Sequence, residues 1–279
     1  MKSTIMIPAF NAEKFLPQTL ESALNQKIET AERPEILIVN DGSTDRTREI
    51  IESYKSMSSN IKVIHQENQG SGVARNVLLK NAIGEILLGL DGDDILHPEA
   101  LETVSRYFED HQDIGFVFTD QNEIDKSGNL LRTRRRKEVN EYFKKLIYHC
   151  HFPGHLRSFR KSRLEGIKFD PSLRTAQDWD FLLKVFSQMK IAHIPKVLYD
   201  YRVHNESISL TRGENVKENS VTLLQHHLQK QGIYNGKQVK IIPTSAGKRM
   251  TYFEHSVNDE LTMDPKARKI LMKYLRCKD

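Results

Sequence analysis

Short apolar segments alternate with amphipathic helical segments over residues 1–120, and this alternation constrains the fold more than any other feature. Apolar residues recur at helical spacing in segments such as "FLPQTLESAL". The order predicts an α/β fold with a central, mostly parallel sheet, helices on both faces and right-handed crossovers. Strands are predicted at 4–7, 35–39, 61–66 and 85–90, and helices at 12–26, 43–57 and 72–84.

Polar clusters follow three of the predicted strands. They are "PAFN" at 8–11, "NDGSTD" at 40–45 and "DGDD" at 91–94. Ligands of parallel α/β sheets bind at the carboxyl ends of the strands. We therefore expect one site to collect all three clusters.

The "DGDD" cluster places Asp91, Asp93 and Asp94 close together. Like charges at this spacing raise one another's pKa unless a cation lies among them. An EF-hand loop is excluded, because Ile95 and Leu96 occupy positions that need an oxygen ligand and a glycine. Two interpretations stay open: a surface turn, or a Mg²⁺ or Mn²⁺ site completed by substrate phosphate.

Length and cysteine content point to an ordinary globular protein. A chain of 279 residues can bury one large core, or one core and a smaller appendage. Cys150 and Cys277 are far apart and in no CxxC spacing, so neither a disulfide framework nor a zinc site is indicated. No apolar run approaches the ~20 residues of a membrane span, and Asn11 and Glu13 interrupt the opening apolar segment. We expect a cytoplasmic protein.

Basic residues give a formal net charge of +5, which favours anionic partners. They gather at 132–137 and at 265–278. The second run reads as a basic amphipathic helix, with two interpretations left open: peripheral contact with the inner face of a membrane, or packing against its own domain. Nucleic acid is not expected as a partner, because no recognised motif is present and the acidic cluster would be unexplained.

Four motifs in order, "IPAFN", "IVNDGSTD", "GVARN" and "LDGDD", resemble the nucleotide-sugar domain of family 2 glycosyltransferases, which have the GT-A fold. The resemblance continues through "AQDWDFLLKVF" and "YRVHNESIS", to about residue 210, and the last part is similar to bacterial chondroitin and hyaluronan polymerase modules. It implies a catalytic domain at 1–210, with a nucleotide-binding half (1–120) and an acceptor half (121–210). The remainder, 211–279, reads as a mainly helical extension with one strand near "VKII".

The resemblance also implies roles for individual residues in binding a UDP-sugar donor. Pro8, Phe10 and Asp41 would hold the uracil, Arg75 would line the nucleotide pocket, and Asp91 would bond the ribose. The donor's diphosphate would be bridged by Mn²⁺ or Mg²⁺.

The same resemblance assigns metal binding and catalysis to three further residues. Asp93 would ligate the metal, and His204 matches a position near the metal or diphosphate, with a structural histidine as the open alternative. Asp178 would be the general base that takes the proton of a saccharide or lipid-linked acceptor hydroxyl, with inversion at the anomeric carbon. Gln177 stands where the family usually has glutamate, and Trp179 fits either a sugar platform or the core.

Two other functions compete with a glycosyltransferase. A catalytically silent nucleotide-sugar-binding accessory module would keep the nucleotide motifs, but the presence of Asp178 together with Asp93 favours an enzyme. A nucleotidyltransferase would need a triphosphate-binding loop, and "IPAFNAEKF" lacks the glycine-rich run for it.

Overall fold

A computed structural model describes residues 1–28, 33–135, 154–173, 177–204, 239–243 and 249–253. The chain divides into two compact units, one of residues 1–138 and 153–211 and the other of 139–152 and 212–279. All the candidate site residues lie in the first unit.

The first unit alternates strands and helices as the sequence predicts. Its strands are β1 (Ser3–Ala9), β2 (Glu35–Asp41), β3 (Ile61–Gln66), β4 (Ile86–Gly89), β5 (Ile95–Leu96), β6 (Ile114–Ile124), β7 (Leu130–Arg134), β8 (Ser158–Arg160) and β9 (Lys190–Arg202). Its helices are α1 (Leu16–Leu24), α2 (Thr47–Met57), α3 (Ser71–Asn81), α4 (Ala100–Asp110) and α6 (Gln177–Gln188), with a short 3₁₀ turn, η2 (Lys161–Arg163).

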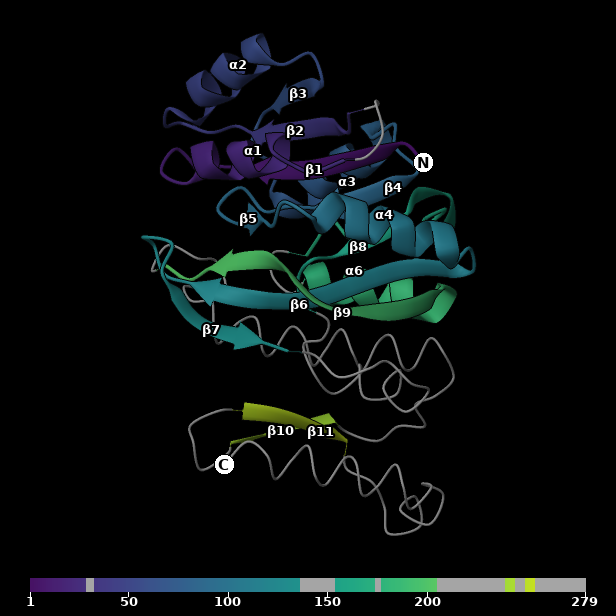
Figure 1. The fold of residues 1–279 in the computed structure, drawn as a ribbon. Coiled ribbons are helices and arrows are strands. Elements are labelled where there is room, and N and C mark those ends of the chain that lie inside the picture. Colours follow the sequence, from purple (N-terminus) through teal and green to yellow (C-terminus); the bar gives the residue numbers. More distant parts are fainter. Residues whose placement is uncertain (29–32, 136–153, 174–176, 205–238, 244–248, 254–279) are drawn as a thin grey trace, which may run out of the picture. The chain divides into compact units, whose positions relative to one another are not determined.

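The strands form one sheet in the order β3-β2-β1-β4-β8-β6-β9-β5, and β7 pairs with β6 (Figure 1). The pairs among β3, β2, β1 and β4 are parallel, so their carboxyl ends share one edge. β8 then runs antiparallel to both β4 and β6, and β9 runs parallel to β6. This second part brings the segment before β8 and the end of β9 to the edge where β4 ends.

The core lies between the sheet and its helices, and Figure 1 shows α1 and α4 in front of the sheet with α3 and α6 behind it. Every residue of β2 is buried, as expected for a strand covered on both faces. Helices contribute one apolar side each, for example Leu16 and Leu20 of α1 and Val104 and Phe108 of α4, all fully buried.

Two helix starts differ from the sequence prediction. α1 begins at Leu16 rather than near residue 12, with Pro17 in its first turn, where a missing N–H costs nothing. α2 begins at Thr47, and neither Ser43 nor Thr44 caps it. Instead, Asn11 of the loop after β1 donates its N–H to Ser43 Oγ and accepts a hydrogen bond from Thr44 N, so tertiary contacts hold the first residues of the predicted helix outside it.

The end of α3 also differs from the sequence prediction. The sequence predicts that Gly84 closes this helix, but α3 ends at Asn81. A Cβ at Gly84 would lie only 2.5 Å from Ser3 C and Thr4 N. Glycine is required here because the backbone of β1 passes so close, not because a helix cap needs it.

In the hairpin between β6 and β7 the chain turns at residues 125–129. The Asp125 carboxylate accepts hydrogen bonds from the main-chain N–H groups of Ser127 and Asn129, which fixes the turn.

The described residues of the second unit form an antiparallel pair, β10 (Val239–Pro243) and β11 (Arg249–Phe253). The sequence predicts only the first of these strands. The basic segment at 265–278, Cys150 and Cys277 lie outside the described residues. Within the described part of the chain, none of the helices has both the length and the apolar character needed to cross a bilayer.

Replacing Gly84 by alanine tests the close approach of β1. Gly84→Ala should lower the free energy of unfolding by about 3 kcal/mol, because backbone atoms on both sides cannot move aside. Gly128→Ala is the matched control: its φ of 91° strains an alanine, but no atom lies within 4 Å of the added methyl group, so roughly 1 kcal/mol is expected. Urea denaturation measures both, and equal losses would contradict the steric explanation.

Candidate active site

The three polar clusters meet at the carboxyl edge of the parallel strands. Asn11, after β1, takes a φ of 47°, accepts a hydrogen bond from Thr44 N (2.9 Å) and donates its own N–H to Ser43 Oγ (3.0 Å). A Cβ at Gly92 would lie 3.1 Å from Pro8 O, so the acidic loop packs directly on the loop after β1. The expectation that one edge of the sheet collects all three clusters is therefore confirmed.

Asp41, at the end of β2, is buried and anchors the start of α3. Its carboxylate accepts hydrogen bonds from Gln66 Nε2 (2.7 Å), Gln69 N (3.0 Å) and Gly70 N (2.9 Å). A carboxylate offers about four acceptor positions, so one is left for a ligand. Phe10, by contrast, is 51% exposed, and its ring is available for stacking.

Asp94 holds the acidic loop in place. It is fully buried, and its two oxygens accept hydrogen bonds from Tyr199 OH and Arg202 N, both at 2.7 Å. Burial, with the charges of Asp93 and Asp91, raises the pKa of Asp94 well above its usual range. These two fixed donors are what allow a third carboxylate in so short a loop.

Asp91 forms an ion pair with an arginine. Arg75 of α3 donates to its carboxylate at 2.9 Å. Burial raises the pKa of Asp91, but Arg75 and His155 together lower it and leave that pKa below its ordinary value. Arg75 also lies 3.6 Å from Asp178 Oδ1, so it joins the acidic loop to α6.

Asp178, in the first turn of α6, lies between two guanidinium groups. Arg157 donates to its Oδ2 at 2.7 Å, and Arg75 faces its Oδ1. Burial raises the pKa of Asp178, yet the charges of Arg75 and Arg157 lower it far below the usual range. The side chain is still 38% exposed, so a ligand can reach it.

The residues that flank Asp178 secure the start of α6. Gln177 Oε1 accepts a hydrogen bond from Ser71 Oγ (2.7 Å), and a Cβ at Gly72 would lie 3.0 Å from the Gln177 amide carbon. Gln177 thus packs on the start of α3. Trp179 is only 6% exposed, which favours its core role over a sugar platform.

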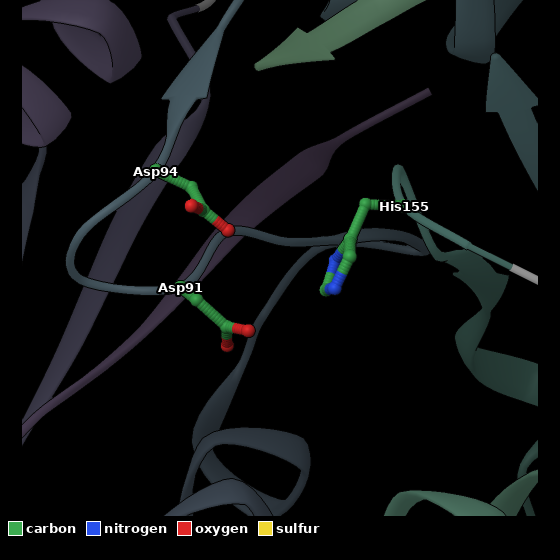
Figure 2. Close-up of side chains that lie close together, drawn as sticks. All are labelled: Asp91, Asp94 and His155. Carbon is green, nitrogen blue, oxygen red and sulfur yellow. The ribbon is translucent and has the colours of Figure 1, made fainter. Parts of the chain in front are cut away.

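At the acidic loop, two groups of described side chains have the donor atoms for a divalent cation. His204 Nε2 lies 2.9 Å from Asp93 Oδ2. In the second group, one ligand atom each from Asp91, Asp94 and His155 lie within 4.8 Å of one another, and Figure 2 shows the two carboxylates and the ring pointing into the same space.

The first group fits a metal better. In the second, both Asp94 oxygens already accept hydrogen bonds from groups fixed by the fold, and the Asp91 carboxylate is paired with Arg75. The Asp93 carboxylate is 34% exposed, and burial next to Asp91 raises its pKa, so a nearby cation would stabilise its ionised form.

A small cavity of about 60 Å³ lies beside Asp91. Three residues that the resemblance assigns to nucleotide binding line it, Pro8, Arg75 and Asp91, together with His155 and Arg157. The structure thus brings these three together with the surroundings of Asp178.

The sequence prediction missed His155, Arg157, Tyr199 and Arg202. A signal existed for Arg202, since an arginine inside the otherwise strand-like "VLYDYRVH" needs buried acceptors. His155 and Arg157 lie in "GHLRSFRKSRLEGIKFD", a stretch within the family 2 resemblance that was given no role, and only the pairing of β8 with β4 brings it to the site.

The family model described as "Glycosyl transferase family 2" matches residues 4–167. The chain belongs to this family. The glycosyltransferase is 29% identical to "Chondroitin synthase" of Escherichia coli over 89% of its own length and 36% of the relative. It is 31% identical to "Putative glycosyltransferase EpsH" of Bacillus subtilis, over 74% of this chain and 62% of that one. The chain therefore spans less than two thirds of these relatives.

Solved structures agree on the GT-A fold of this family 2 glycosyltransferase. TarS 1-349 of S. aureus, in complex with UDP-GlcNAc, superposes with a TM-score of 0.68 at 24% identity, covering 82% of this chain and 66% of that chain. The mannosyltransferase PcManGT of Pyrobaculum calidifontis, in complex with GDP-Man and Mn²⁺, gives a TM-score of 0.59 at 18% identity, covering 84% of this chain and 65% of PcManGT.

Removing one hydroxyl tests whether Asp94 depends on its fixed donors. Tyr199→Phe leaves a buried carboxylate oxygen without its donor and should lower the free energy of unfolding by about 2 kcal/mol. Tyr54→Phe is the control, because the Tyr54 hydroxyl bonds Glu21 at the surface and its loss should cost well under 1 kcal/mol. Thermal unfolding compares the two, and equal melting temperatures would assign Asp94 a different support.

Proposed function

We propose that the protein is an inverting, metal-dependent glycosyltransferase that moves a sugar from a UDP-sugar to a hydroxyl of a saccharide or lipid-linked acceptor. The observation that carries the proposal is the ion-pair chain Asp91–Arg75–Asp178, in which one arginine joins a donor-side carboxylate to the candidate base. A silent nucleotide-sugar-binding module would need no base at that point.

The donor would lie along the carboxyl edge of β1, β2 and β4. Phe10 would stack on the uracil, Asp41 would accept from its imide N–H, and Pro8 would border the base. Asp91 would bond the ribose, and Arg75 would stay beside it at 2.9 Å. The TarS structures with UDP and with UDP-GlcNAc support a UDP-sugar as the donor class.

Asp93 and His204 would hold Mn²⁺ or Mg²⁺ beside the diphosphate. Carboxylate oxygen and imidazole nitrogen are both ligands of Mn²⁺ sites, and the neighbour PcManGT holds Mn²⁺. The cation supplies positive charge that stabilises the departing phosphates.

The reaction needs one displacement at the anomeric carbon. The acceptor oxygen forms a bond to that carbon while the bond to the UDP oxygen breaks, and UDP leaves with the electron pair. Asp178 takes the proton of the acceptor hydroxyl as the new bond forms. Attack on the face opposite the leaving group inverts the anomeric configuration.

We assign the activity to residues 1–210, with the nucleotide half at 1–120 and the acceptor half at 121–210. The extension at 211–279 would serve the acceptor or its carrier. Its basic C-terminal segment is the candidate for peripheral contact with the inner face of the membrane.

Metal dependence of UDP binding tests the donor site. Mn²⁺ should strengthen UDP binding to the wild type, and Asp93→Ala and His204→Ala should each remove that gain, roughly tenfold or more. His111→Ala, on the exposed end of α4, is the control. Calorimetric titration with and without chelator measures the effect. Equal UDP affinity in both conditions would reject the metal, and a loss confined to His155→Ala would move it to the second group.

The general base is tested by Asp178→Asn. The amide keeps the shape but cannot take a proton, so transfer should fall roughly 10²-fold or more while the Kd for the donor stays within about twofold. Asp180→Asn is the matched control on the same helix, because the Asp180 carboxylate pairs with Lys184. A panel of UDP-sugars with mixed saccharide acceptors supplies the assay. Transfer retained by Asp178→Asn would assign the base elsewhere.

A further inference from the structure

Arg157 lies immediately before β8, and the sheet holds its main chain firmly. Its carbonyl accepts the N–H of Gly89 at 3.0 Å, and the next residue, Ser158, pairs with Leu88 of β4. Asp91 follows β4 only two residues after Gly89. Arg157 and Asp91 are therefore fixed by adjacent strands at the same edge of the sheet.

The guanidinium of Arg157 is directed at Asp178. Arg157 donates to Oδ2 at 2.7 Å, while Arg75 faces Oδ1 at 3.6 Å, so each carboxylate oxygen has its own cation. Arg75 is shared, because it also bonds Asp91. The Arg157 side chain is 21% exposed, which keeps the pair in a partly desolvated place where charge-assisted hydrogen bonds are strong.

Two other buried arginines show what a purely structural role looks like in this chain. Arg160 donates to the carbonyl oxygens of Phe108 and Ile114. Arg202 likewise donates to several carbonyl oxygens, those of Asp93, Asp125 and Lys126. Arg157 donates to a carboxylate instead, and its buried Nε has no hydrogen-bond partner among the described residues. Arg157 is thus positioned to bond Asp178 rather than to connect loops through their carbonyl oxygens.

We propose that Arg157 is a positioning residue of the transfer reaction, which holds the Asp178 carboxylate ionised and in a fixed orientation for the acceptor. This inference rests on the proposed function, in which Asp178 takes the acceptor's proton. A base must be ionised before the acceptor arrives, and burial alone would favour its protonated form.

The sign of the pH effect follows from the groups around Asp178. Arg75 from α3 and Arg157 and His155 from the segment before β8 lower its pKa, while burial and the negative charge of Asp91 oppose them. The base acts only above its pKa. Removing Arg157 raises the pKa, so the fall of activity on acidification begins at a higher pH.

The pH dependence of the transfer rate distinguishes a positioning role of Arg157 from a purely structural one. In Arg157→Met, kcat should fall and the acid limb should move up by about one pH unit or more, with the donor KM within about twofold. Arg157→Lys keeps the charge and should keep the limb near that of the wild type, at reduced kcat. Arg106→Met, which removes an arginine paired with Glu102 on α4, is the control. A lower rate with an unmoved limb in Arg157→Met would overturn the proposal.

A titration by carbon-13 NMR tests the role of Arg157 without an assay of sugar transfer. The carboxyl signal of Asp178 is assigned by its loss in Asp178→Asn, and its pKa is then compared between the wild type and Arg157→Met. A higher pKa in the variant supports the inference, and an unchanged pKa overturns it, even if the wild type transfers no sugar and the proposed function fails. Melting temperatures confirm that the compared variants are folded.

Discussion

The contacts of Arg202 hold the candidate site together. Its N–H bonds Asp94, its guanidinium donates to Asp93 O (2.8 Å) and to the turn after β6, and it lies 4.8 Å from the ring of Phe15. One buried arginine thereby fastens the acidic loop to the end of β9, through its main-chain N–H and through carbonyl oxygens that its guanidinium bonds. His204 follows two residues later and reaches Asp93 for this reason. Leaving these buried carbonyl oxygens without their donor is costly, so the loop and β9 depend on each other.

The parallel half of the fold could be predicted because its information is local. The spacing of apolar residues and the turn residues between segments predict β1, β2, β3 and β4 and the helices between them. The carboxyl ends of parallel strands must then lie at the same edge of the sheet. The misses came from contacts between distant residues. Asn11 bonds Ser43 and Thr44, which were expected inside the helix that in fact begins at Thr47, and Gly84 is required by the backbone of β1 rather than by its own helix.

The site was partly predictable for the same reason. Arg75 and Asp91 were expected near a nucleotide, and the structure joins both to Asp178 through one guanidinium. Whether Asp41 and Phe10 contact a base stays a prediction. Arg157 could not have been found from spacing, because its place depends on β8 entering the sheet beside β4 in the opposite direction. The three carboxylates of the acidic loop could not be told apart by sequence either: burial and partners give Asp94 a structural role and leave Asp93 and Asp91 accessible to ligands.

Two flanking guanidinium groups lower the basicity of a carboxylate and hold it in a fixed position. A general base works best when its pKa approaches the working pH, and the two arginines shift Asp178 away from that value. An alcohol, however, releases its proton only as the new bond forms, so the alignment of the oxygen atoms decides the rate, and well-aligned groups can gain several kcal/mol. The phosphates of a bound donor would also compete for Arg75, which already divides itself between two carboxylates. Arg157 would then remain as the fixed partner, and Asp178 would gain basicity at the point in the cycle where the donor is in place.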